Sequence, residues 1–118
     1  MGDIAGTLEV VADPERLAIR AADIIAERMA AASPPFRLVL SGGSTPRRTY
    51  EILAQRNLDW ACVEIFFGDE RFVPPDDPAS NYRMARESLI GHINPRKLFP
   101  IPTDGTPQSA ADRYEEIL

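Results

Sequence analysis

Residues 36–46 read FRLVLSGGSTP, and this stretch decides the fold. Its apolar run, Phe36 to Leu40, stops at the pair Gly42-Gly43, a pattern that predicts a short strand buried on both faces of a parallel sheet. Ser44 offers a hydroxyl for an N-cap and Pro46 lies in the first turn, so a helix is expected directly after the glycines. The stretch therefore predicts a strand, a tight turn and a helix in succession.

The sequence before this stretch predicts a further strand and helix. Residues 7–12 alternate loosely and are rich in β-branched side chains, which favours a short edge strand. Asp13 is a natural N-cap and Pro14 suits the first helical position, so a helix is expected to run from here to the break at residues 33–35. The buried stripe predicted for this helix consists of Leu17, Ala21, Ile24, Ile25 and Met29.

The sequence after the stretch continues the alternation. The helix after the glycines is expected to reach about Asn57, and residues 63–67 predict a second buried strand. Ser80 is expected to cap a third helix, residues 98–101 to form a brief edge strand, and Thr106 to cap a last helix. The buried residues expected on these three helices are Tyr50, Leu53 and Ala54, then Tyr82, Ala85, Leu89 and Ile93, then Ala110, Tyr114, Ile117 and Leu118.

Strands and helices that alternate in this way predict an α/β fold with a mostly parallel sheet covered on both faces. The length of 118 residues suits a single domain, and 44% hydrophobic with 26% charged residues are ordinary globular values. No linker or internal repeat interrupts the chain. We therefore expect residues 1–118 to fold as one unit.

The charge of the chain bears on its partners. Lysine and arginine number 13 against 18 aspartate and glutamate, a formal net charge of −5. Nonspecific binding to nucleic acid or to an anionic membrane depends on attraction to phosphate, so neither partner is expected. Any anion that this protein binds has to be held by a local site.

The cysteine count and the absence of targeting signals bear on location and cofactors. Cys62 is the only cysteine, which excludes an intramolecular disulfide and a cysteine-based zinc cage and favours a reducing, cytoplasmic location. The N-terminus lacks the pattern of a signal peptide, and no apolar run approaches the ~20 residues of a membrane span. The acidic residues Asp76, Asp77 and Asp104 lack metal-ligand spacing, so no metal and no cofactor are expected.

The glycine turn is the first segment that carries chemistry. Gly42 and Gly43 let the backbone approach a ligand closely, and Ser44, Thr45 and the free N–H groups of the first helical turn can donate to an anion that the helix dipole favours. The segment lacks the residues of a Walker A loop and of the dinucleotide-binding fingerprint. It predicts a phosphate cradle, although an ordinary capped turn between strand and helix has a similar sequence.

The tetrapeptide at residues 68–71, GDER, is the second such segment, because it follows the second buried strand directly. In open parallel sheets ligands bind beyond the carboxyl ends of the strands, where this cluster and the glycine turn are expected to converge. An arginine there can pair with a phosphate, and a carboxylate can orient a hydroxyl group or transfer a proton. Asn81 and Arg83 follow close by. The alternative is a solvated loop whose charges pair only with one another.

Together these segments resemble the 6-phosphogluconolactonase family. The matching residues are LSGGSTP at 40–46, GDERFVP at 68–74 and Ser80-Asn81. The resemblance implies a three-layer α/β/α, Rossmann-like architecture of the kind shared with glucosamine-6-phosphate deaminases and ribose-5-phosphate isomerases. It also implies hydrolysis of 6-phospho-D-glucono-1,5-lactone to 6-phosphogluconate, the second step of the oxidative pentose phosphate pathway.

The resemblance assigns roles to particular residues. Gly42, Gly43, Ser44 and Thr45 are expected to contact the sugar phosphate. Arg71 adds a charged contact, and Asp69 orients the substrate or the catalytic imidazole.

The family's general base is absent from this sequence. Family members carry this histidine in a later Gly-x-Asp-Gly-His-x-Ala segment that the chain lacks. His92 has no Asp-Gly before it and is predicted to be a histidine at a helix end. Because family members are about twice as long, residues 1–118 are expected to be the N-terminal portion of a single sugar-phosphate-binding α/β domain. That portion is expected to be inactive by itself.

Two other functions are compatible with these segments. A glucosamine-6-phosphate deaminase or sugar-phosphate isomerase would use the same anchor for proton transfer, but deaminases usually show Thr-Gly-Ser-Thr-Pro and Asp-Glu-Tyr where this chain has Ser41-Gly42-Gly43 and Arg71. A non-catalytic sugar-phosphate-binding module would need no base. The sequence indicates no oligomeric state.

Overall fold

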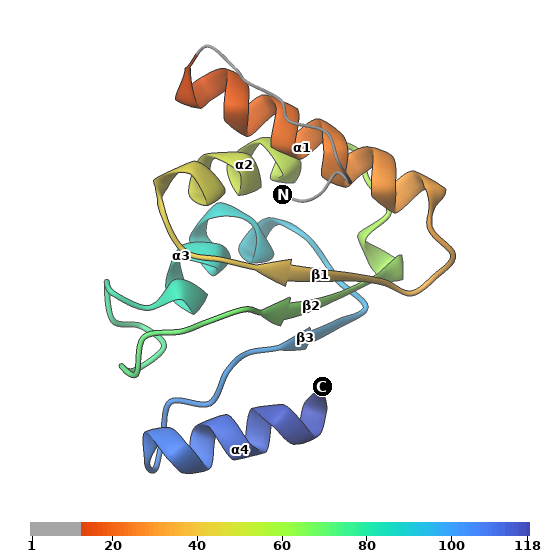
Figure 1. Cartoon of the computed structure of the whole chain (residues 1–118). Helices are drawn as coiled ribbons and strands as arrows, with labels where there is room; N and C mark the ends of the chain where they lie inside the picture. The colour runs from red at the N-terminus through yellow and green to blue at the C-terminus, as the bar shows by residue number, and fades with distance from the viewer. Residues whose placement is uncertain (1–12) are drawn as a thin grey trace, which may run out of the picture.

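Three parallel strands form the centre of the structure, a computed structural model that describes residues 13–118 (Figure 1). The strands β1 (Phe36–Leu40), β2 (Val63–Phe67) and β3 (Lys97–Phe99) lie side by side in that order. Phe36 lies opposite Val63, and Glu64 lies opposite Lys97. The expected parallel sheet is confirmed. The strand predicted at residues 7–12 lies outside the described residues.

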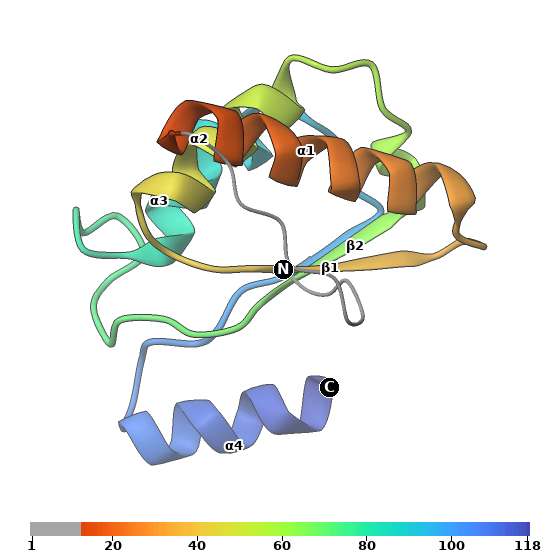
Figure 2. The ribbon, with the colours of Figure 1, turned by 45° about the horizontal axis from the view of Figure 1, so that its top comes forward.

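Helices cover both faces of this sheet. The elements α1 (Pro14–Ala31), α2 (Ser44–Ala54) and α3 (Asn81–Ser88) lie on one face, whereas α4 (Pro107–Ile117) lies alone on the other (Figure 2). Two short 3-10 helices, η1 (Trp60–Cys62) and η2 (Ile90–His92), precede β2 and follow α3. Within residues 13–118 no helix is both long and apolar enough to cross a membrane. The arrangement confirms the α/β fold with three layers.

Side-chain caps begin three of the helices where the sequence predicts them. Oδ1 of Asp13 accepts a hydrogen bond from the backbone N–H of Arg16 at 2.8 Å. Ser80 caps α3 through the N–H of Arg83, and Thr106 caps α4 in a capping box with Ser109. Each cap satisfies an N–H group that has no partner within its helix.

The buried side of α1 is only in part the predicted one. Ala18 and Ala22 are fully buried, and Ile25 and Met29 pack against the core, whereas the side chain of Leu17 is 40% exposed. The predicted residues Leu17, Ala21 and Ile24 instead line a groove of about 570 Å³ between α1 and β1. The cause is packing, because the small alanine side chains allow α1 to lie closely against α2.

The burial of the strands differs along the sheet. All five residues of β2 are buried, as predicted for a strand covered on both faces. The same prediction was wrong for β1, because Arg37 is exposed and Val39 is 59% exposed. The single helix on this second face, α4, bonds to β2 and β3, so it leaves the outward residues of β1 uncovered. The core lies on the other face, where β1 and β2 meet α1, α2 and α3.

The one charged residue of β2, Glu64, is a buried carboxylate with two arginine partners. Glu64 is 8% exposed, and its two oxygens pair with Nε of Arg37 at 3.3 Å and with Nε of Arg96 at 3.4 Å. The two arginines belong to segments on either side of β2. Because a buried charge needs such partners, the pairs connect neighbouring segments of the sheet.

Several element ends also differ from the predictions. The helix α2 ends at Ala54 rather than near Asn57, and β3 spans residues 97–99 rather than 98–101. The third helix ends at Ser88, before Ile93, because the backbone of Leu89 leaves the helical conformation at φ = −138° and ψ = −62°. On α4, Ala110 and Tyr114 are buried as predicted, whereas Ile117 and Leu118 are 43% and 77% exposed. Ile117 and Leu118 instead line an open pocket of about 410 Å³ between the last turn of α4 and the sheet residues Val39, Phe66 and Phe99.

Tyr114 of α4 joins the ends of β2 and β3. Its hydroxyl accepts a hydrogen bond from the N–H of Phe67 at 2.7 Å and donates one to the carbonyl of Phe99 at 2.8 Å. A side-chain hydroxyl thus stands between two backbone groups of adjacent strands. This fixes α4 to the sheet at the carboxyl ends of the strands.

Replacement of this hydroxyl tests its contribution to stability. Tyr114→Phe leaves the N–H of Phe67 and the carbonyl of Phe99 without their partner, so we expect the free energy of unfolding to fall by about 1–3 kcal/mol. Urea unfolding followed by circular dichroism measures the loss. The matched control is Tyr82→Phe, because the Tyr82 hydroxyl makes no hydrogen bond to residues 13–118. Equal effects of the two substitutions would contradict the assignment.

Candidate functional site

The glycine turn leads directly from β1 into α2. Gly43 is the N-cap of α2 and has φ = 118°, a conformation that favours glycine, so Ser44 is the first helical residue and not the predicted cap. No side chain caps α2, whereas Asp13, Ser80 and Thr106 cap the other three α-helices of residues 13–118. The N–H groups of Ser44 and Thr45 therefore remain available to an anion, which the helix dipole favours at this place.

Tyr50 holds this turn against α2. Its hydroxyl accepts a hydrogen bond from the N–H of Ser41 at 2.8 Å and donates one to the carbonyl of the same residue at 3.1 Å. Burial raises the pKa of the Tyr50 hydroxyl, and the negative charge of Asp69 raises this pKa further, although the bond with Ser41 opposes the shift. The residue that follows β1 is thus fixed by a neutral hydroxyl in the core.

The second predicted segment lies beside the turn. The N–H of Gly68 donates to the carbonyl of Leu40 at 2.9 Å, so the end of β2 adjoins the end of β1. Asp69 and Arg71 are exposed there. The guanidinium of Arg71 forms no ion pair within residues 13–118, and the mutual pairing of Asp69, Glu70 and Arg71 that the alternative requires is not observed. The structure brings together the two ends of the strands, as the sequence predicts.

Glu70 has a structural role that sequence reasoning missed. Its carboxylate accepts hydrogen bonds from the backbone N–H groups of Arg71, Asn81 and Tyr82, at 2.8, 2.6 and 2.9 Å, and from the hydroxyl of Ser80 at 3.2 Å. The N-terminus of α3 is therefore occupied by a carboxylate of the chain itself. Ser80 predicts that a helix starts here, but the sequence gives no sign that the carboxylate of Glu70 bonds to this helix start.

Gly42 lies against the side chain of Asn81. A Cβ at Gly42 would overlap Oδ1 of Asn81 and would lie 2.8 Å from its Cγ. Asn81 is the first residue of α3 and is 9% exposed. A side chain at position 42 would therefore displace Asn81 from its contacts with Asp69.

Three arginines near the site pair with carboxylates instead. Arg47 pairs with Glu87 at 3.6 Å, and Arg48 pairs with Glu15 at 2.9 Å. Arg83 pairs with Glu87 at 3.1 Å and donates to the carbonyl of Asp76. Arg83, which the sequence places near the second segment, therefore turns to other partners, and Arg71 is the arginine of that segment without an ion pair in residues 13–118.

The only histidine lies away from the turn. His92 is exposed in η2, and its Nε2 lies 3.0 Å from the carbonyl oxygen of Glu87, in the last turn of α3. The turn contacts the first residue of that helix, Asn81. The structure therefore confirms that His92 is a histidine at a helix end.

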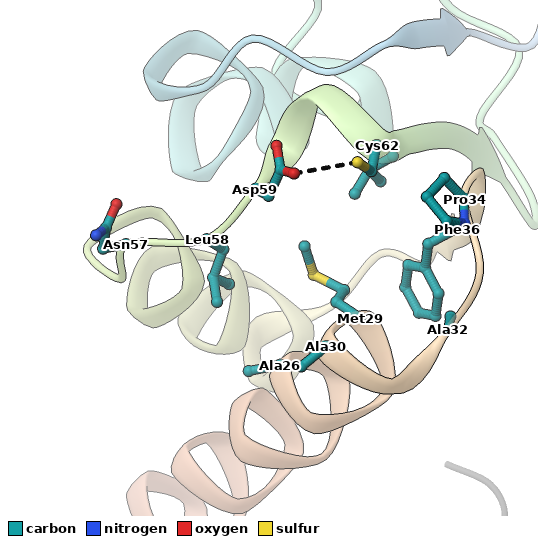
Figure 3. A pocket seen from close by; sticks show the side chains of 11 residues that line it. Ala26, Met29, Ala30, Ala32, Pro34, Phe36, Asn57, Leu58, Asp59 and Cys62 are labelled. Atoms are coloured by element: carbon teal, nitrogen blue, oxygen red, sulfur yellow. Dashed lines mark hydrogen bonds between the residues drawn. The ribbon is translucent and has the colours of Figure 1, made fainter.

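A separate pocket lies at the amino-terminal ends of β1 and β2 (Figure 3). It has a volume of about 410 Å³, and Met29, Phe36 and Leu58 supply apolar walls. The thiol of Cys62 donates to Oδ2 of Asp59 at 3.1 Å, and this carboxylate raises the pKa of the thiol. A thiol held neutral in this way is a poor nucleophile. The pocket therefore does not contribute to the candidate site.

The fold and the site define a class of protein. An uncapped helix N-terminus at the carboxyl end of a parallel strand, with an exposed carboxylate and an exposed arginine at the end of the next strand, is typical of an α/β protein that binds an anionic ligand. A model of the family described as "Glucosamine-6-phosphate isomerases/6-phosphogluconolactonase" matches residues 12–118. The chain belongs to this family.

Known proteins agree with this membership. A 6-phosphogluconolactonase from Nostoc sp. is 37% identical over 118 residues, which cover 95% of this chain and 49% of that protein. The crystal structure of 6-phosphogluconolactonase from Leishmania guyanensis matches with a TM-score of 0.85 at 27% identity, over 98% of this chain and 51% of the other. A monomeric glucosamine-6-phosphate deaminase matches with a TM-score of 0.77 at 25% identity, over 91% and 47% of the two chains. The chain spans about half the length of these relatives.

The close approach at Gly42 generates a stability prediction. Gly42→Ala forces Asn81 out of its place, so we expect a loss of about 1–3 kcal/mol in the free energy of unfolding, measured by urea unfolding. Gly68→Ala is the matched control, because its Cβ would lie 3.4 Å from Cγ1 of Val39, an ordinary contact. A smaller loss for Gly42→Ala than for Gly68→Ala would show that the turn is not packed as described.

The raised pKa of Tyr50 predicts a pH dependence. Above about pH 10 the unfolded chain releases tyrosine protons that the folded chain retains, so the free energy of unfolding should fall as the pH rises. Urea midpoints between about pH 8 and about pH 11 are expected to fall less steeply in Tyr50→Phe than in the native chain. Both proteins carry Cys62→Ala, because the thiol also titrates in this range. Parallel slopes would contradict the prediction.

Proposed function

We propose that this chain supplies the phosphate-binding part of a 6-phosphogluconolactonase, an enzyme that hydrolyses 6-phospho-D-glucono-1,5-lactone to 6-phosphogluconate. One observation carries the proposal: the uncapped N-terminus of α2, formed by the family's LSGGSTP segment, lies beside the end of β2, where Asp69 and Arg71 are exposed. A sugar phosphate whose phosphate group binds at the N-terminus of α2 would place its sugar ring near Asp69 and Arg71. The relatives named 6-phosphogluconolactonase support the same activity.

Each site residue has a role in this proposal. Gly42 and Gly43 allow the phosphate to approach the backbone, and Ser44 and Thr45 donate N–H and hydroxyl groups to its oxygens. Arg71 adds a positive charge that no carboxylate of residues 13–118 neutralises. Asp69 accepts from a hydroxyl group of the sugar and thereby orients the ring. Because the chain carries a net charge of −5, these local groups have to outweigh the long-range repulsion of an anionic substrate.

Hydrolysis of the lactone requires more than this part of the site. Attack of water on the carbonyl carbon needs a general base and donors for the developing oxyanion, and the loss of each such group typically reduces the rate by ~10² or more. The family's histidine segment is absent from residues 1–118, and His92 lies at the far end of α3. We therefore propose that residues 1–118 are the N-terminal portion of a single sugar-phosphate-binding α/β domain, which acts in the reducing cytoplasm that the single cysteine favours.

The two rival functions would use the same anchor. The fold does not separate lactonases from deaminases, since a deaminase structure matches with a TM-score of 0.77. The residues favour the lactonase, because Ser41-Gly42-Gly43 and Arg71 depart from the deaminase pattern. A non-catalytic sugar-phosphate module would bind the ligand through the same groups, and a continuation of the chain that carries Asp-Gly-His would exclude it.

A binding and activity experiment tests the proposal. The 118-residue chain should bind 6-phosphogluconate, with the largest NMR shifts at the amides of residues 42–45, and should open the lactone no faster than buffer at neutral pH. Arg71→Ala should weaken binding about tenfold, because a charge-assisted hydrogen bond is lost. Arg86→Ala is the matched control, since Arg86 is exposed near the other end of α3.

The outcomes separate the candidate functions. Robust lactonase activity of the short chain would show that its own residues supply a base. Release of ammonia from glucosamine-6-phosphate would favour the deaminase. Absence of 6-phosphogluconate binding, or equal effects of Arg71→Ala and Arg86→Ala, would refute the proposed anchor.

A further inference from the structure

Asn81 contacts both segments of the candidate site. Its Nδ2 donates to the backbone carbonyl of Asp69 at 3.3 Å and to the carboxylate oxygen Oδ1 of the same residue at 3.4 Å. Its Oδ1 lies where only a glycine at position 42 fits. One side chain that is 9% exposed therefore lies between the phosphate turn and the carboxylate proposed to orient the sugar.

Glu70 holds Asn81 in this place. The carboxylate accepts the backbone N–H of Asn81 at 2.6 Å and that of Tyr82 at 2.9 Å, and both bonds lie at the start of α3. Glu70 directly follows Asp69 in the chain, so the same carboxylate also restricts the backbone on which Asp69 lies. The first turn of α3 and the loop after β2 are joined as one unit.

The chemistry of the asparagine suits this position. A neutral amide offers two N–H donors to a carboxylate and adds no charge, whereas a second carboxylate at the same place would repel Asp69. The two bonds from Nδ2, at 3.3 and 3.4 Å, are longer than a typical N–H···O bond. A bond of this kind directs a carboxylate without neutralising it.

We propose that Asn81 is a positioning residue, which holds the Asp69 carboxylate at a fixed place relative to the Gly42–Thr45 turn so that one sugar phosphate reaches both. The proposal rests on the proposed function and deepens it. Asn81 itself does not touch the phosphate in this scheme. Its effect on ligand binding passes through Asp69.

A double-mutant cycle tests this route. Asn81→Ser, which removes the amide without filling the space beside Gly42, is expected to weaken 6-phosphogluconate binding about five- to tenfold. In the Asp69→Asn background the same change should alter affinity less than about twofold, because the carboxylate that Asn81 positions is gone. The affinity for inorganic phosphate, which needs only the turn, should stay the same. Asn57→Ser, at an exposed asparagine, is the matched control.

The outcomes separate positioning from a merely structural role. Equal losses in both Asp69 backgrounds, or a parallel loss of inorganic phosphate binding, would overturn the proposal. A second measurement needs no ligand: the side-chain amide signals of Asn81 in a 15N NMR spectrum should shift in Asp69→Asn, while those of Asn57 stay in place. Absence of that shift would also overturn it. If the amide responds but the native chain binds no 6-phosphogluconate, the proposed function fails while the contact between Asn81 and Asp69 stands.

Discussion

The arrangement of the site depends on one carboxylate, that of Glu70, which satisfies four donors at the start of α3 and in the loop before it. A buried or half-buried carboxylate is stable only when its oxygens are so occupied, and the N–H groups of a first helical turn are stable only when something accepts them. The carboxylate of Glu70 and the N–H groups at the start of α3 therefore satisfy one another's hydrogen bonds. The same hydrogen bonds hold Asn81 against Gly42 and Asp69, and so they set the distance between the two segments of the site.

The N-termini of α1, α2, α3 and α4 differ in whether a side chain of the protein accepts hydrogen bonds from their N–H groups. Those of α1, α3 and α4 are completed by side chains of the chain, whereas that of α2 is not. The overall field of an acidic chain repels an anion, so the attraction that the proposed function requires would arise at the uncapped start of α2 and at Arg71, which forms no ion pair within residues 13–118. The other arginines around the turn, Arg47, Arg48 and Arg83, are paired with carboxylates and stabilise the helix layer.

Two tyrosines stiffen the edge of the sheet on which the site lies. Tyr50 reaches Ser41 from the helix layer on one face, and Tyr114 reaches Phe67 and Phe99 from α4 on the other. In both cases a phenolic hydroxyl accepts from one backbone N–H and donates to one carbonyl, which replaces hydrogen bonds that strands lose where they diverge. The carboxyl ends of the strands are thereby held from both faces of the sheet, and a ligand that binds there meets a backbone already in place.

The sequence by itself determined the elements whose signals are local. Asp13, Ser80 and Thr106 cap helices because their hydroxyl or carboxylate reaches an N–H three residues on, and the glycine pair marks a turn because only glycine adopts φ = 118° without strain. Only the tertiary structure decided that Ala18 and Ala22 rather than Leu17 and Ala21 face inward on α1, that β1 is covered on one face alone, and that Glu70 bonds to α3 across the intervening loop. These outcomes depend on which surfaces meet in space, and periodicity along the chain carries no information about that.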